Sequence, residues 1–187
     1  LGLAGIPAMA EVITLERDLR LVELTGARYH AAQISCRAAV EVMRAAKARG
    51  LPVTCGVSVH HLTLNENDVG AYRTFFKLSP PLRSEDDRLA LVEAVADGTI
   101  DVIASDHAPH HYDAKEREFD NAPNGIIGLE TALGVAIRDL VESGVLSLPA
   151  LIDRMSTRAA RRRWASTAPI LLPASSSHPS SAIDRSA

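Results

Sequence analysis

The chain has 187 residues, 47% of them hydrophobic and 23% charged, which is typical of one globular domain with a sizeable core. A net charge of −3 without a basic stripe argues against nucleic acid as the main partner. No apolar run is long enough to span a bilayer. The two cysteines are too few for a disulfide framework. We therefore expect a cytoplasmic protein that is not bound to a membrane.

Helices and strands are predicted to alternate along most of the chain. Apolar periodicity predicts helices over 8–24, 40–49, 85–96, 129–140 and 148–155. Gly26 is the expected C-cap of the first helix, and Ser84 the N-cap of the third. Short apolar runs predict strands over 28–35, 53–64, 74–78 and 99–105. Because strands that alternate with helices form parallel βα units, the predicted fold class is α/β with a parallel sheet.

Polar or ionisable residues stand at the ends of all four predicted strands. In chain order they are Gln33 with Ser35, His60 with His61, Lys77 with Ser79, and Asp106 with His110. The carboxyl ends of barrel strands meet at one mouth, where active sites lie. Four βα units correspond to half of an eight-stranded barrel. The first residues carry neither an initiator Met nor the charged start of a signal peptide, so we expect the chain to begin inside a longer protein.

The stretch 102–111, VIASDHAPHH, holds the densest group of chemically active residues. A buried strand is followed by Asp106, His107, His110 and His111 within six positions. Aspartate and histidine are metal ligands and proton carriers, so this stretch favours a catalytic or metal site. The alternative is a polar turn after a core strand with a chance cluster of histidines.

The end of the chain differs from the rest. Residues 161–187 are rich in Ser, Ala and Pro without apolar periodicity, which is typical of disorder. We expect a partial barrel over 1–158 and a disordered tail over 159–187. A slip of reading frame near Ala159 would produce such a composition.

Several motifs resemble one enzyme family. The segment Ser105-Asp-His-Ala-Pro-His110, followed by Gly128-Leu-Glu-Thr131, resembles the strand-eight signature of dihydroorotases and related cyclic amidohydrolases. Residues 76–83, FKLSPPLR, are similar to the strand-seven segment, His60-His-Leu to strand six, and 29–35 to strand five. The resemblance implies the C-terminal half of a (β/α)8 barrel, with strands five to eight and their helices.

The resemblance also implies a reaction and a set of roles. Dihydroorotate and N-carbamoyl-aspartate would interconvert, as in pyrimidine biosynthesis, with one or two Zn²⁺ ions activating a water. Asp106 would bind metal and shuttle the proton, and His60 or His61 would be a second ligand. His110, Ser79 and Arg83 would contact substrate. A homodimer or a complex with aspartate transcarbamoylase is implied as the assembly.

Three positions depart from the family pattern. Gln33 stands where most members have a metal-binding His, Val59 precedes His60 and His61 instead of Pro, and Ser79 replaces an Asn. The amide of Gln33 is a poor zinc ligand. These departures fit an enzyme with one firm metal, or a non-catalytic scaffold for aspartate transcarbamoylase. An allantoinase or hydantoinase is a third alternative, against which 77–83 argues.

Two further expectations concern the chain as it stands. It contains no His-x-His motif and only four readable strands, so we expect it to be inactive by itself. Lys115 and Glu116 in the polar loop 112–124 are either solvated charges or part of a lid over the mouth.

Overall fold

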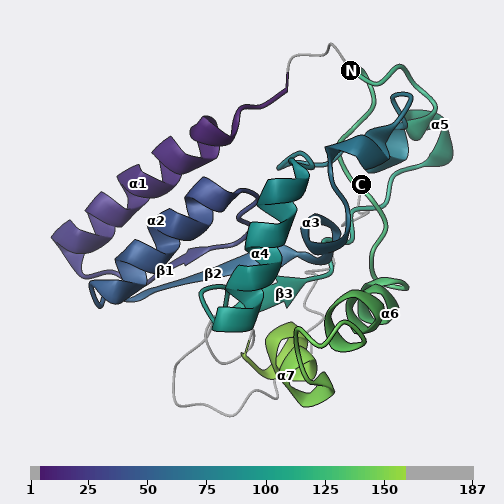
Figure 1. Cartoon of the computed structure of the whole chain (residues 1–187). Helices are drawn as coiled ribbons and strands as arrows, with labels where there is room; N and C mark the ends of the chain where they lie inside the picture. The colour runs from purple at the N-terminus through teal and green to yellow at the C-terminus, as the bar shows by residue number, and fades with distance from the viewer. Residues whose placement is uncertain (1–4, 159–187) are drawn as a thin grey trace, which may run out of the picture.

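A three-stranded parallel sheet forms the centre of the molecule (Figure 1). The computed structural model describes residues 5–158. Strands β1 (Tyr29–Ala31), β2 (Val53–Ser58) and β3 (Val102–Ala104) lie in the order β1-β2-β3. Tyr29 pairs with Val53, and Gly56 with Val102. The predicted α/β class with parallel strands is therefore confirmed.

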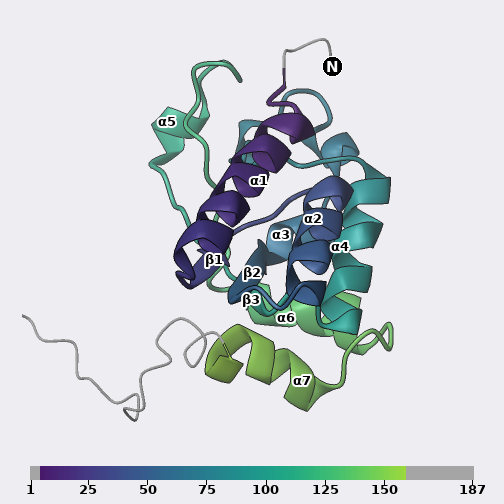
Figure 2. The ribbon, with the colours of Figure 1, turned by 90° about the vertical axis from the view of Figure 1, so that its left-hand side faces the viewer.

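Three helices cover one face of this sheet as a layer, with α2 between its neighbours (Figure 2). They are α1 (Ala8–Thr25), α2 (Arg37–Ala48) and α4 (Glu85–Asp97). The first helix buries the periodic apolar side chains that predicted it, namely Val12, Leu15, Leu19 and Val22. Its ending is also confirmed, because Gly26 adopts a left-handed conformation with φ of 68°. Ser84 caps α4 as expected, since its side chain accepts a hydrogen bond from the Asp87 backbone N–H.

Shorter helical pieces connect these units and complete the core. Between β2 and α4 lie α3 (Val59–Thr63), η1 (Glu66–Val69) and η2 (Thr74–Phe76). After β3 come α5 (Tyr112–Lys115) and α6 (Ala132–Ala136), which continues into the π-helical stretch η3 (Ile137–Val141). Helix α7 (Leu148–Ile152) continues into a second π-helical stretch, η4 (Asp153–Thr157). No helix within 5–158 is long and apolar enough to cross a membrane.

The strand predicted over 74–78 is wrong. Its first part is the 3₁₀ turn η2, and β3 pairs directly with β2, so no strand lies between them. Neighbouring groups hold this segment outside the sheet: the Thr74 hydroxyl donates to the Lys115 carbonyl, and Lys77 reaches the carbonyls of a later loop. Pro80 and Pro81 follow, and neither has an N–H for a strand ladder.

The strand predicted over 53–64 is too long. It ends at Ser58, whose hydroxyl accepts the His60 backbone N–H at 3.1 Å and thereby starts the helical turn α3. His60 and His61 consequently lie on a helical turn just past the strand end. The predicted disordered tail, with its frame-slip explanation, lies outside the described residues.

An ion pair closes the amino end of the sheet. Asp101, immediately before β3, is 1% exposed. Its Oδ2 lies 2.6 Å from Lys47 Nζ and accepts the Cys55 backbone N–H at 2.9 Å. Lys47 Nζ also donates to the Thr99 carbonyl at 2.6 Å. This buried charge is therefore paired and hydrogen-bonded, which is the condition for its burial to be tolerated.

Candidate active site

His60 places an unpaired nitrogen at the carboxyl end of the sheet. The side chain is 6% exposed, and its Nε2 is buried without a hydrogen-bond partner. The ring lies close to the backbone of Ser105 and Asp106, and the Asp106 charge acts on it. Burial lowers the pKa of His60 more strongly than the Asp106 charge raises it. The imidazole is thus held in its neutral form, in which histidine binds metals.

His61 is anchored more firmly than its neighbour. Its Nε2 lies 3.1 Å from the Pro80 carbonyl oxygen and 3.2 Å from that of Pro81, so this nitrogen carries the proton and donates. Burial again lowers the pKa of the imidazole. The other ring nitrogen, Nδ1, is buried without a partner. His61 thereby ties α3 to the Pro80–Pro81 turn and keeps one free lone pair.

Asp106 stands where the chain leaves β3. It is half-buried and has a φ of 49°, an uncommon conformation for a residue with a side chain. The next residue supports this turn, because His107 Nδ1 accepts the backbone N–H groups of Gly128 and Leu129, each at 3.1 Å. His107 therefore connects the end of the strand to the Gly128-Leu-Glu-Thr131 motif through these two hydrogen bonds. Local strain of this kind gathers at functional sites.

Gly128 lets that motif press directly against the strand end. A Cβ at this position would lie 2.2 Å from the Ser105 carbonyl oxygen and 3.0 Å from His60 Nε2. Any side chain would have to displace backbone, so only glycine fits. The close approach also seals one side of the His60 ring.

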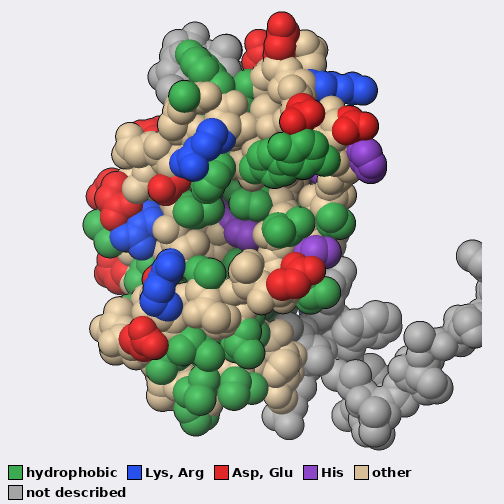
Figure 3. All heavy atoms as spheres, turned by 90° about the vertical axis from the view of Figure 1, so that its right-hand side faces the viewer, with side chains coloured by type: hydrophobic (Ala, Val, Ile, Leu, Met, Phe, Trp, Pro, Cys, Tyr) green, Lys and Arg blue, Asp and Glu red, His purple; other side chains and the backbone are tan. Residues whose placement is uncertain are grey.

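His110 and His111 lie on the surface beyond the strand end. Figure 3 shows this side of the molecule, where histidine, acidic and hydrophobic side chains lie next to one another. His110 Nε2 lies 2.8 Å from the Asn124 carbonyl oxygen. His111 Nδ1 lies 3.4 Å from an Asp113 carboxylate oxygen. Of the two, His110 is the one held by a backbone contact.

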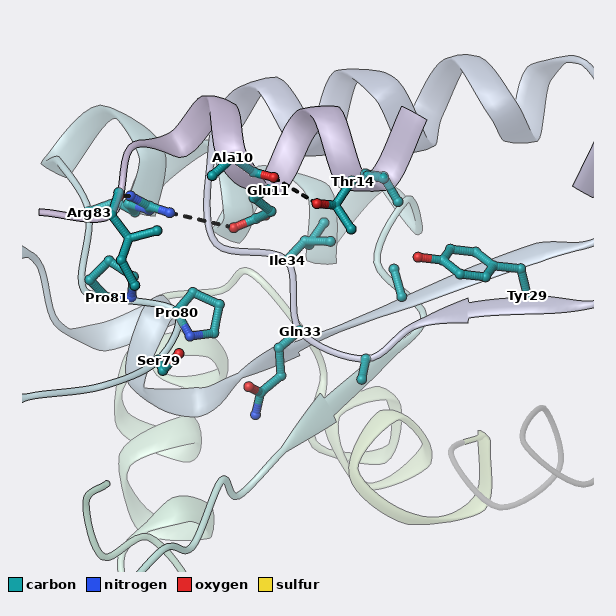
Figure 4. Close-up of a pocket in the computed structure, with 14 residues that line it drawn as sticks. Ala10, Glu11, Thr14, Tyr29, Gln33, Ile34, Ser79, Pro80, Pro81 and Arg83 are labelled. Atoms are coloured by element: carbon teal, nitrogen blue, oxygen red, sulfur yellow. Dashed lines mark hydrogen bonds and ion pairs between the residues drawn. The ribbon is translucent and has the colours of Figure 1, made fainter. Parts of the chain in front are cut away.

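Ser79, Arg83 and Gln33 line one cavity of about 360 Å³ (Figure 4). Arg83 forms an ion pair with Glu11 at 3.7 Å and donates to the Ser35 hydroxyl at 3.1 Å. Gln33 points away from this ion pair in Figure 4. It also lines a second cavity, of about 710 Å³, together with Ser105.

The described residues bring two of the predicted metal ligands together but do not complete a metal centre. The Asp106 charge acts on the His60 imidazole, whereas residues 5–158 contain no group of three or more His, Cys, Asp or Glu side chains placed to hold a metal. A hydrolytic zinc ordinarily has three protein ligands and an open position. The neutral imidazole and the carboxylate suit zinc chemically, and further donors would have to come from outside this range.

Sequence reasoning missed a buried lysine in the loop above this site. Lys115 is only 3% exposed, and its Nζ donates to the carbonyls of Pro123 and Gly125. It is therefore not one of the solvated charges that the sequence allowed. The polar composition of 112–124 hid it, and no periodicity could have revealed it.

The chain is similar to known proteins in sequence and in structure. No family model matches it. A dihydroorotase from Anaeromyxobacter dehalogenans is 53% identical over 163 residues, which cover 86% of this chain and 37% of that protein. One from Geobacter metallireducens is 49% identical over 161 residues, covering 86% and 38%. Among solved structures, a D-hydantoinase (dihydropyrimidinase) from Thermus sp. matches with a TM-score of 0.77 and 30% identity, over 83% of this chain and 35% of that one. An L-hydantoinase from Arthrobacter aurescens matches with a TM-score of 0.78 over the same shares.

The parallel βα units, with Asp106 and His60 at their carboxyl ends, therefore define a segment of a cyclic amidohydrolase. The chain spans little more than a third of the length of the relatives that it matches. Within the class, its curated relatives at about half identity are dihydroorotases, and the resemblance of its motifs to that family is confirmed.

Proposed function

We propose that this chain supplies part of the active site of a metal-dependent dihydroorotase, which interconverts dihydroorotate and N-carbamoyl-aspartate in pyrimidine biosynthesis. The observation that carries the proposal is the unpaired, buried Nε2 of His60 beside Asp106. The three described strands would be neighbours in the second half of a (β/α)8 barrel. By itself the chain would be inactive, because the described residues lack a third ligand.

In this proposal His60 and Asp106 hold zinc, one or two ions in the complete site. His61, whose Nδ1 is also unpaired, is the second choice for the histidine ligand. Bound zinc supplies Lewis-acid activation of the attacking water. Asp106 takes a proton from that water while the oxygen of the water bonds to the ring carbonyl carbon. The ring C–N bond then breaks, and Asp106 returns the proton to the leaving nitrogen.

Substrate contacts come from residues around the mouth. A donor at His110 suits the substrate carboxylate. Ser79 lines the 360 Å³ cavity. Its hydroxyl would form a hydrogen bond to the substrate in place of the Asn that the family usually has there. Arg83 lines the same cavity, but Glu11 already holds its guanidinium, so we assign it the smaller share of carboxylate binding. The free thiols Cys36 and Cys55 favour the cytoplasm as the compartment.

A second candidate is a non-catalytic scaffold that binds aspartate transcarbamoylase. Gln33 favours it, because an amide stands where most of the family has a metal-binding His. A homodimer is the simpler assembly for the enzyme. A hydantoinase or allantoinase is less well supported, because the hydantoinases share 30% identity with this chain and the dihydroorotases about half.

A chimera tests the proposal directly. In it, the matched part of this chain replaces the corresponding 163-residue stretch of the Anaeromyxobacter dehalogenans relative, so that the rest of that protein completes the site. We expect zinc-dependent hydrolysis of dihydroorotate and cyclisation of N-carbamoyl-aspartate. A folded, zinc-loaded chimera without either activity would contradict the proposal. Co-purification of such an inactive chimera with aspartate transcarbamoylase would support the scaffold.

A further inference from the structure

Four consecutive backbone carbonyls, those of residues 122–125, each accept a hydrogen bond from a basic side chain. Lys77 Nζ donates to Ala122 at 2.8 Å, Lys115 Nζ to Pro123 at 2.9 Å and to Gly125 at 2.8 Å, and His110 Nε2 to Asn124 at 2.8 Å. The Gly125 backbone N–H in turn donates to the Lys77 carbonyl at 2.8 Å. We call residues 122–125 the carbonyl segment. Its backbone is thus held by side chains from three places in the chain: Lys77 just after η2, Lys115 in α5, and His110 in the segment that follows β3.

Of the three basic side chains, Lys115 has the largest free-energy cost of burial. Its side chain is buried, and its Nζ donates to carbonyls only, with no carboxylate partner among the described residues. Burial, and then the nearby charge of Lys77, lower the pKa of Lys115. An ammonium group is expensive to bury without a counter-ion. Placing two ammonium groups on one short backbone stretch adds repulsion, which their hydrogen bonds to the carbonyls have to offset.

His110 is the exposed group that this segment positions. Its Nε2–H is held by the Asn124 carbonyl, and a Cβ at Gly125 would lie 2.9 Å from its Cδ2 and Nε2. Gly125 has a φ of 140°, which side chains rarely adopt. The ring therefore rests directly on backbone whose own position depends on Lys115 and Lys77.

We propose that Lys115 and Lys77 are positioning residues, which hold the carbonyl segment so that His110 presents a fixed ring to a substrate carboxylate. Because Nε2–H is donated to Asn124, the ring binds the carboxylate as an imidazolium, whose Nδ1–H is the donor. The inference rests on the proposed function and deepens it. Both lysines act through His110 and touch no substrate themselves. Their effect is therefore on ground-state binding of the carboxylate more than on the chemical step.

The test compares Lys115→Met and Lys77→Met in the chimera with His110→Ala. We expect each lysine variant to raise the KM for N-carbamoyl-aspartate and its Kd in titration calorimetry by about tenfold, with kcat changed by less than about threefold. In the His110→Ala background, Lys115→Met should add less than about twofold, because the two residues act as a unit. Zinc content should not change. Hydrogen exchange should increase at the Gly125 amide.

Lys47→Met is the matched control, since it removes a half-buried lysine at the opposite end of the sheet. It should lower stability without changing Kd. A Lys115→Met variant with unchanged Kd, or with the same loss of affinity when residue 110 is Ala, would overturn the positioning role. A parent chimera that neither binds nor converts N-carbamoyl-aspartate would instead contradict the proposed function, so the two failures can be told apart.

Discussion

The two ends of the sheet differ in whether their buried polar groups have hydrogen-bond partners. At the amino end, Asp101 is paired with Lys47 and with a backbone N–H, so its charge is satisfied within the fold. At the carboxyl end, His60 Nε2 and His61 Nδ1 are the two side-chain nitrogens within the described residues that are buried without a partner. A satisfied buried network stabilises a fold, whereas an unpaired buried group costs about 1–3 kcal/mol. This difference is the reason why our proposal assigns the ligand site to the carboxyl end.

The largest expected effect comes from Asp106, at the carboxyl end. Asp106→Asn in the chimera should reduce turnover in both directions by about 10³- to 10⁴-fold, because an amide cannot accept the proton of the attacking water. The unfolding midpoint should shift little, since Asp106 is only half-buried. Steady-state rates and a thermal melt check both statements. Turnover within about threefold of the parent would remove Asp106 from the mechanism.

Removing the ion pair at the amino end should instead lower stability and leave turnover unchanged. Lys47→Met leaves the Asp101 carboxylate buried without its cation, and we expect the free energy of unfolding to fall by about 3 kcal/mol. The kcat of the folded fraction should not change. Urea denaturation and kinetics on the same sample measure both. Arg44→Met is the control, because its ion pair with Asp97 is surface-exposed and should contribute less than about 1 kcal/mol.

A comparison of the two histidines sharpens the assignment at the carboxyl end. His60→Ala should weaken zinc binding in the chimera by about 100-fold, because it removes a ligand. His61→Ala should cost mainly about 1 kcal/mol of stability through the lost contact to the Pro80 and Pro81 carbonyls. Zinc analysis after dialysis, with a melt of each variant, checks the pair. The opposite ranking would make His61 the ligand.

The smallest expected effect concerns Cys55, which lies in β2 beside Asp101. Burial raises the pKa of its thiol to about 12, from an ordinary value of 9.0. A thiol with a raised folded-state pKa contributes stability that is present below pH 9 and is lost as the pH rises above it. We expect no alkylation of Cys55 by iodoacetamide at pH 8 until urea unfolds the chain. Rapid labelling of the folded protein would show that this end opens locally.

The sequence by itself determined the class of fold and supplied the residues from which the site is proposed. Helices α1 and α4 follow from apolar periodicity and from their caps at Gly26 and Ser84, because these signals are local. Asp106 and His60 are predicted at neighbouring strand ends, since parallel strands bring their carboxyl ends to one edge. In the structure the charge of Asp106 acts on the His60 imidazole, so the two residues lie at the same end of the sheet.

Only the tertiary structure decided which apolar runs became strands and which charges became buried. The run 74–78 has strand-like composition, but β3 takes the place beside β2, and long-range hydrogen bonds hold the run in a 3₁₀ turn. Lys115 ends the short helix α5 within the polar segment 112–124, where local composition predicts a solvated charge. Its burial depends on the carbonyls of Pro123 and Gly125, which only the folded loop brings to its ammonium group. Pairing partners and carbonyl acceptors are set by the whole fold, and a window of sequence does not contain them.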